Sequence, residues 1–267
     1  MKVRKPNFLF NTNTPAHWLG GSPLKSHLCN SFTLLFPAGE KFFIKSVQKL
    51  FSEIQSENLK AEAKLFIKQE AQHYLEHEKF FQILRAQGYD IDKILTIVEG
   101  VVTSISENLI SHRTAMAITA GCEHITALLS EIAISDDFFR EAPADLKALF
   151  EWHSLEELEH RSVAFDVFEE TDGKYSSRVI GLLGAYVFFT ALTTFITCSL
   201  MRQDKTLFRL KTVQEAMDIF FLDQKLFFKA ANIFGRYLLP NFHPSGNKQL
   251  ESLMRTVFSR YASYGVA

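Results

Sequence analysis

Cysteine is scarce in this chain, and the few that occur lie far apart. The 267 residues include only Cys29, Cys122 and Cys198, and no Cys-x-x-Cys pair is present. An odd number of widely separated cysteines excludes a disulfide framework and a thiolate metal site. The same pattern favours a protein from a reducing compartment.

Proline and glycine are also few, with seven and twelve residues, whereas phenylalanine occurs 26 times and hydrophobic residues make up 47%. Because proline and glycine interrupt regular helices, their scarcity favours long packed helices over strands and loops. The hydrophobic content is enough to bury a sizeable core. We therefore expect an all-α fold.

The chain also has no large excess of positive or negative charge. The formal net charge is -1, and no basic cluster is interleaved with aromatic residues, so nucleic acid is not an expected partner. The chain begins Met1-Lys-Val-Arg-Lys-Pro6, but polar residues, proline and glycine follow where a secretory signal would have a continuous apolar run. We expect a cytoplasmic protein.

One long stretch has no charged residue. It runs from Val179 to Met201 between Arg178 and Arg202, and a helix of this length, at about 1.5 Å per residue, could cross a bilayer. Its threonines and glycines disfavour a membrane span. The basic residues that follow it would lie on the cytoplasmic side of a span, which would put the bundle before it outside the cytoplasm. Four alternatives stay open: a membrane span, contact with the inner face of a membrane, a buried helix or lipid-substrate tunnel wall, and a homodimer face.

The apolar periodicity predicts a ferritin-like four-helix bundle with a long crossover and additional C-terminal helices. Residues 1–35 are expected to form an irregular N-terminal arm, residues 36–172 the bundle, and residues 173–267 apolar helices packed on it. The expected bundle helices begin at Pro37, at about 59 and 113, and near Pro143, and end at about 54, 87, 134 and 171. The expected crossover covers 91–109, and two later helices cover 213–239 and 248–261.

The segment Glu151-Trp-His153-Ser-Leu-Glu-Glu157-Leu-Glu-His160 carries three metal-capable side chains on one helical stripe. At about 100° per residue, His153, Glu157 and His160 project within about 60° of one another. The segment contains Glu-x-x-His, the pair that carboxylate-bridged two-metal bundles take from two of their four helices.

A second segment repeats this pattern nearer the N-terminus. Glu70 and His73 stand three residues apart, and His77 falls on the same face one turn later. A lone Glu-x-x-His pair on a helix is usually solvated, so the pair alone is a weak signal. Two pairs in one helical chain raise the question of whether two further helices supply the remaining carboxylates.

Two glutamates complete the set at matching distances. Glu40 lies 30 residues before Glu70, and Glu123 lies 34 residues before Glu157. On antiparallel helix hairpins each pair reaches the same height only if the turns fall near residues 55 and 140. Turn-forming residues occur at both places, with Gln55-Ser-Glu-Asn58 in the first and Asp136-Asp137 and Pro143 in the second.

Buried carboxylates need compensating positive charge, which two divalent metals would provide. A set of oxygen and nitrogen donors without thiolate suits iron best, manganese also, and zinc less selectively. The expected metal ligands are Glu40, Glu70, His73, Glu123, His153, Glu157 and His160, with His77 as a further candidate ligand or a supporting contact.

Other acidic and imidazole side chains are assigned ordinary roles. Glu156 and Glu159 are expected at the surface, because they are taken to point away from the stripe. His124, adjacent to Glu123 and so about 100° around the helix, is expected in a packing or supporting role. Glu107 and Glu131 would be the alternatives if Glu123 did not reach the site.

Three longer strings contain the candidate ligands. They are Phe36-Pro-Ala-Gly-Glu40-Lys-Phe-Phe43, Gln69-Glu-Ala-Gln-His73-Tyr-Leu-Glu-His77 and Trp152-His-Ser-Leu-Glu-Glu-Leu-Glu-His-Arg-Ser-Val-Ala-Phe-Asp166. These strings resemble a bacterial family of predicted metal-dependent hydrolases, and the resemblance extends over nearly the whole chain. The spacing of His153, Glu157 and His160, with Glu70 and His73 upstream, is also similar to the ferritin-like di-iron aminobenzoate N-oxygenases. That likeness implies metal roles for these residues, with a third histidine at position 153.

The ligand set favours a di-iron enzyme that oxidises an apolar small molecule with O2, using an external electron donor. The phenylalanine content and the uncharged stretch favour an apolar substrate, such as an acyl chain. Hydrolysis by a two-metal-activated water is the alternative. A non-catalytic metal-binding or membrane-associated helical protein is the third hypothesis.

Overall fold

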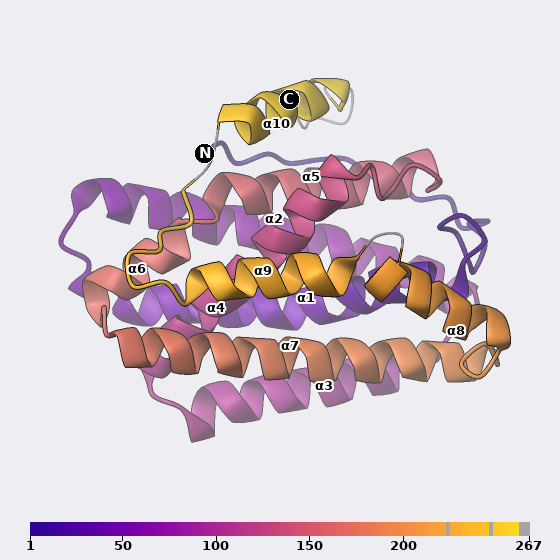
Figure 1. Ribbon diagram of the computed structural model, residues 1–267, viewed down its shortest axis with the longest axis horizontal. Coiled ribbons are helices and arrows are strands. Elements are labelled where there is room, and N and C mark those ends of the chain that lie inside the picture. Colours follow the sequence, from indigo (N-terminus) through magenta and orange to yellow (C-terminus); the bar gives the residue numbers. More distant parts are fainter. Residues whose placement is uncertain (223–224, 246–247, 262–267) are drawn as a thin grey trace.

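The computed structural model describes residues 1–222, 225–245 and 248–261, and within these ranges the secondary structure is helical, with no strand. The all-α prediction is therefore confirmed, and Figure 1 shows the long helices lying side by side as a bundle. The helices are α1 (Pro23–Leu50), α2 (Glu57–Ala86), α3 (Asp92–Ser104), α4 (His112–Ser135), α5 (Ala144–His160), α6 (Val163–Thr171), α7 (Tyr175–Gln203), α8 (Leu210–Met217), α9 (Leu226–Tyr237) and α10 (Lys248–Arg260).

The connections follow the order of a ferritin-like bundle. Helices α1 and α2 form one hairpin and α4 and α5 another, and their turns, at residues 51–56 and 136–143, fall where the ligand spacing predicts them. Helix α3 joins the two hairpins as the crossover and packs against α1 at the edge of the bundle (Figure 1). An ion pair between Arg113 and Glu53, 2.6 Å apart, places the start of α4 beside the end of α1. Helix α4 is therefore antiparallel to α1, as a long crossover requires.

The first helix begins well before the residue that the sequence pattern predicts. Ser22 caps it by accepting a hydrogen bond from the backbone of Lys25, and Pro23 occupies the first turn, where its missing N–H is not needed. The irregular arm thus ends at residue 22, and the predicted boundary at residue 35 is wrong. Pro37, taken as the helix start, lies inside α1. The helical pattern before it is hidden because polar side chains such as Asn30 point into the core.

Two predicted helices are divided in the structure. The helix expected to run from Pro143 to Thr171 stops at His160, and α6 continues from Val163 to pack on α2 and α4. The prediction of one continuous helix over 213–239 is also wrong. Residues 223–224 lie outside the described residues, but the backbone at the next residue already interrupts a helix. Lys225 has a left-handed backbone with φ 51°, which no right-handed helix accommodates, and α9 begins immediately after it.

Helix α7 covers the bundle along α4 and α1, as Figure 1 shows. The closest approach is at Gly181, where an added Cβ would lie 2.4 Å from the carbonyl oxygen of Ala117 on α4. Gly121 faces the same crossing, where an added Cβ would lie 3.0 Å from the Cβ of Ala185. Small residues on both helices therefore let the two backbones touch, and this contact fixes α7 as one wall of the site described below.

We predict that Gly181→Ala destabilises the protein, because its methyl group meets backbone that a rotamer change cannot move aside. The free energy of unfolding should fall by about 1–3 kcal/mol, measured by chemical denaturation. Gly184→Ala is the matched control on the same helix, since its nearest neighbour is the flexible side chain of Ile118 at 3.4 Å. Equal stability of the Gly181→Ala variant and the wild type would contradict the close crossing.

Candidate metal centre

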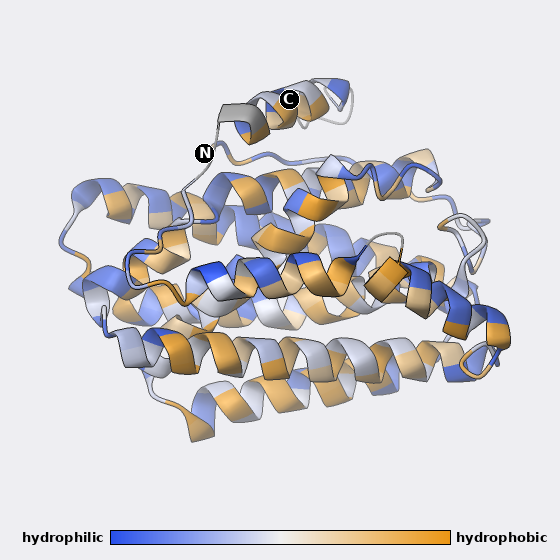
Figure 2. Ribbon diagram, viewed as in Figure 1, coloured by the Kyte–Doolittle hydropathy of each residue, from blue (hydrophilic) through white to orange (hydrophobic). Residues whose placement is uncertain are grey.

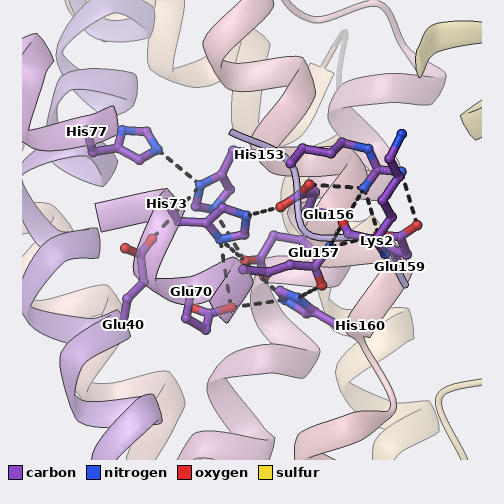
Figure 3. Close-up of polar contacts among 12 residues, drawn as sticks. Lys2, Glu40, Glu70, His73, His77, His153, Glu156, Glu157, Glu159 and His160 are labelled. Carbon is purple, nitrogen blue, oxygen red and sulfur yellow. Dashed lines mark hydrogen bonds and ion pairs between the residues drawn. The ribbon is translucent and has the colours of Figure 1, made fainter. Parts of the chain in front are cut away.

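Four helices point acidic and imidazole side chains at one interior region, shown in Figure 3. Each of these residues is at most 4% exposed. The structure brings together all seven expected ligands: Glu40 from α1, Glu70 and His73 from α2, Glu123 from α4, and His153, Glu157 and His160 from α5.

The candidate ligand atoms form two adjacent groups. Glu40, His73 and His153 make up one group, and Glu70, Glu123, Glu157 and His160 the other, and within each group the atoms lie within 4.8 Å of one another. This is the arrangement expected of two neighbouring cation positions, each with at least one imidazole and one carboxylate.

Glu157 lies between the two groups. Its Oε1 is 3.3 Å from Nε2 of His153, 3.5 Å from Nε2 of His160 and 3.6 Å from Nδ1 of His73. Glu70 has a similar position, with Oε1 3.2 Å from His160 and 3.7 Å from His73. These two carboxylates therefore face both groups, and Glu40 and Glu123 each face one.

The carboxylates in this region lack the hydrogen bonds that buried oxygens normally have. Both oxygens of Glu40, Glu70 and Glu123, and Oε2 of Glu157, find no hydrogen-bond donor among the described residues. Nδ1 of His73 and Nε2 of His160 also make no hydrogen bond within that part of the chain. Leaving so many polar atoms unsatisfied would cost several kcal/mol. Cations bound by these lone pairs would remove that cost, so the residues fit a metal pair.

A ring of supporting contacts holds the imidazoles. Nε2 of His77 lies 3.0 Å from Nδ1 of His153, and Nδ1 of His77 lies 3.2 Å from the hydroxyl of Thr33. Glu156 bonds Nε2 of His73 at 3.2 Å, and Gln69 bonds Nδ1 of His160 at 3.3 Å. Such contacts fix the tautomer and orientation of ligand histidines. His77 therefore lies behind His153 and outside both groups of candidate ligand atoms.

The N-terminal arm closes this ring. Arg4 donates hydrogen bonds to Glu156 at 3.0 Å and to Glu159 at 2.9 Å, and Gln69 donates to Glu159 at 2.8 Å. The prediction that Glu156 lies at the surface is wrong, because its side chain is 0% exposed. On the helix it stands only about 40° from His160. Glu159 is partly covered by the same contact with Arg4. No local pattern pairs residues so far apart in the chain, so nothing in the sequence pointed to Arg4.

The remaining acidic and imidazole candidates lie elsewhere. His124 packs against Tyr237, with 4.6 Å between ring centroids, and so has a packing role. Glu107 is exposed and pairs with Lys45. The carboxylate from α4 in the candidate centre is Glu123, so Glu107 is not needed as its replacement. Glu131, the other alternative, lies on α4 and belongs to neither group of candidate ligand atoms.

A separate group, made of His17, His27 and Asp204, joins the arm, α1 and the end of α7. Nε2 of each histidine lies 2.7 Å from Oδ2 of Asp204, and the Tyr89 hydroxyl donates to the same oxygen at 3.2 Å. Burial acts to raise the pKa of Asp204, but hydrogen bonds from His17, Thr206 and His27 lower it to about 2. The carboxylate is satisfied by these donors, and the group holds the arm to the bundle.

Burial and mutual repulsion perturb the acids of the centre. Burial, followed by neighbouring carboxylates, raises the pKa of Glu40 and Glu70 well above the usual value, and burial raises that of Glu123 to about 7. Burial acts in the same direction on Glu157, but hydrogen bonds with His153 and His160 outweigh it and lower its pKa. Without cations, the site therefore holds extra protons near neutral pH.

An apolar cavity of about 400 Å³ leads to the centre. Residues from α1, α3, α4 and α7 form its walls, and Glu40, His153 and Glu157 form part of its lining. Most of the other lining side chains are aliphatic or phenylalanine. A ligand in this cavity would therefore touch hydrocarbon on most sides and candidate metal ligands at one end.

Fold and site together define an all-α bundle with carboxylates and imidazoles converging from four helices. The chain belongs to the family described as predicted metal-dependent hydrolase, whose sequence model matches residues 2–248. The match confirms the resemblance seen in the three sequence strings. No curated protein and no solved structure matched the chain.

We predict that Glu70→Ala removes most bound metal, because Glu70 faces both groups of candidate ligands. Wild-type protein purified without chelators or tags should contain about two metal ions per chain, and the variant fewer than one, by elemental analysis. Glu78→Ala on the same helix is the matched control, since Glu78 is exposed and pairs with Lys41. Unchanged metal content in the Glu70→Ala variant would exclude this ligand assignment.

We also predict that metal-free protein loses stability as pH rises from 7 to 8.5. The raised pKa values of Glu40, Glu70 and Glu123 mean that the folded state keeps protons that the unfolded chain has released. Each proton that the folded state keeps lowers the free energy of unfolding by about 1.4 kcal/mol per pH unit. Glu123, with a pKa of about 7, contributes mainly at the lower end of this pH range. His73 and His77, whose pKa values are lowered by burial, are neutral in the folded state and largely neutral in the unfolded chain across this range, so they change the slope little.

Metal-loaded protein is the control for this titration. Bound cations keep the carboxylates ionised in the folded state, so its stability should change little between pH 7 and 8.5. Urea denaturation of both forms measures the difference. Parallel pH profiles for the two forms would show that cations do not replace protons at this site.

Proposed function

We propose that the protein is a di-metal carboxylate enzyme, with iron as the preferred metal, that oxidises an apolar small molecule with O2. Glu40, His73 and His153 would hold one ion and Glu123 and His160 the other. Glu70 and Glu157, which face both groups, would be shared between the ions. When reduced and bound, such a pair supplies electrons to O2, while the chain positions the substrate and excludes water.

One observation carries the proposal: the apolar cavity ends at the two groups of candidate ligands. A polar substrate entering the cavity would lose its hydration and gain few hydrogen-bond partners there. An alkyl or acyl chain has no hydrogen bonds with water to lose, and its burial in the cavity would be stabilised by the hydrophobic effect. The donor set, made of glutamate and histidine without thiolate, supports iron or manganese over a soft-metal site.

Glu156, His77 and Gln69 would keep the imidazoles in place during the reaction. Each contacts the ring nitrogen of a candidate ligand histidine from outside the two groups. Arg4 balances the charge of Glu156, so the negative charge behind His73 is fixed. These side chains would act by holding the ligand geometry, and the reaction needs an external electron donor for repeated turnover.

Hydrolysis is the second candidate, and the family description favours it. Two metals can lower the pKa of a bound water and polarise a carbonyl or phosphoryl oxygen. The substrate of such a reaction would still need an apolar group that fits the cavity, such as the chain of an ester. The oxidative proposal is preferred because the candidate ligands are glutamates and histidines on the helices of a bundle, the scaffold of carboxylate-bridged iron sites.

An isotope experiment separates the two reaction classes. Metal-free protein is loaded with Fe²⁺ without oxygen, mixed with a medium-chain fatty acid or its ester, and exposed to ¹⁸O₂ for one turnover. The proposal predicts ¹⁸O from O2 in the product, by mass spectrometry. Oxygen from water in a released carboxylate, independent of O2, would support hydrolysis instead. Glu70→Ala should abolish either reaction and Glu78→Ala should not.

A further inference from the structure

Helix α7 has a solvent-facing stripe without charge. Along its length no aspartate or glutamate occurs, and the basic residues lie only near its ends. Ile180, Leu183 and Val187 are 60%, 49% and 65% exposed, at the spacing that places them on one face. Thr190, Ala191 and Thr194 continue the stripe. Figure 2 shows most of this helix in orange or near-white, which are the colours of hydrophobic and neutral residues.

The bundle does not account for this stripe. The opposite face of α7 supplies its core contacts, through Leu182, Ala185 and Ile196, which are fully buried. A surface helix usually carries charged residues on its outer face. Among the described residues, α7 and α4 are the two helices long and apolar enough to cross a membrane, but α4 is mostly buried and α7 packs lengthwise on α4 and α1. One apolar face of α7 is thus committed to the bundle, and the other is left exposed.

The cavity opens on this stripe. Among its lining residues, Val187 and Ala191 of α7 and Val101 of α3 are exposed, whereas Glu40 and Glu157 at the inner end are buried. Val101 and Ile97 project to one side of α3, and Glu99 projects to the other. The mouth is therefore framed by aliphatic side chains, and a continuous apolar path joins the outer face of α7 to the centre.

Basic residues follow the stripe directly. Arg202, Lys205 and Arg209 are exposed in and just after the last turn of α7. Between them, Asp204 turns away from the basic side chains toward His17 and His27, each 2.7 Å from its Oδ2. Phe208 is 93% exposed. An exposed aromatic ring between cations, next to an uncharged helix face, matches the chemistry of an anionic bilayer surface.

We propose that the protein docks on an anionic lipid bilayer through the α7 stripe and the basic turn at 202–209, and that a lipid acyl chain enters the cavity directly from the bilayer at Val101, Val187 and Ala191. The second half of this proposal rests on the proposed function. Docking alone does not, because it uses no residue of the metal centre.

Co-sedimentation with vesicles tests the docking. Full-length protein, purified without detergent, is mixed with vesicles of phosphatidylcholine and phosphatidylglycerol, or of phosphatidylcholine alone. We expect binding to the anionic vesicles, weakened by salt, in both metal-free and metal-loaded protein. Val187→Glu should weaken binding about tenfold or more, and Lys205→Ala and Arg209→Ala about fivefold each.

Leu75→Glu is the matched control, since Leu75 is 42% exposed on α2, which Figure 1 shows on the other side of the bundle from α7. It should bind as the wild type does. Circular dichroism and thermal unfolding confirm that the variants fold. No binding to anionic vesicles, or equal binding of the Val187→Glu variant, would overturn the proposal. The proposal would also be overturned if the protein is a dimer in solution and Val187→Glu dissociates the dimer without changing vesicle binding. That result would mean that a second copy of the chain covers the stripe.

Acyl-chain uptake tests the access route. Phospholipid with a pyrene-labelled chain reports transfer into the protein by its fluorescence, which needs no catalytic turnover. We expect Ala191→Trp, which narrows the mouth, to reduce uptake about tenfold while vesicle binding is retained. Equal uptake by this variant would overturn lateral access. If docking and uptake hold but ¹⁸O₂ chemistry fails, the proposed reaction is wrong and the lipid site stands.

Discussion

The burial of four carboxylates at one point is the constraint on which this structure depends. Glu40, Glu70, Glu123 and Glu157 approach one another in a region nearly closed to water, and most of their oxygens lack hydrogen-bond donors in the described chain. Like charges at such distances cannot all remain ionised without compensation. Protons can supply the compensation in part, and two divalent cations can supply it fully. The helix lengths, the turn positions and the long crossover all serve to bring these four side chains to the same height.

The residues around the centre hold its side chains in fixed positions. Contacts from His77, Glu156 and Gln69 hold the three candidate ligand imidazoles, and Arg4 on the N-terminal arm pairs with Glu156. On the other side, the glycine-lined crossing of α4 and α7 brings α7 close enough to form a wall of the apolar cavity. The candidate centre therefore has hydrogen-bonded polar residues on one side and an apolar cavity on the other. This difference between the two sides supports the proposal of an apolar substrate.

Much of the fold and of the candidate site could be predicted because the signal is local. Local patterns predicted seven side chains that the structure brings together. Two Glu-x-x-His pairs and two glutamates spaced symmetrically about the turns account for six of them, and the seventh is His153, which shares a helical stripe with Glu157 and His160. What could not be predicted depends on distant contacts. The first turns of α1 were hidden because Ser26 and Asn30 face inward and bond to Leu19 and Trp18. Glu156 was misplaced because its partner Arg4 is remote in sequence. The division of the chain at residue 172 stays a prediction.

The central claim is that two cations occupy the point where the four helices converge. Anomalous X-ray scattering from crystals of metal-loaded protein, measured at the absorption edge of the bound metal, tests it most directly. The account predicts two peaks, one among Glu40, His73 and His153 and one beside Glu123 and His160, with Glu70 and Glu157 between them. A single peak, or peaks only at another site such as His17 and His27, would contradict it.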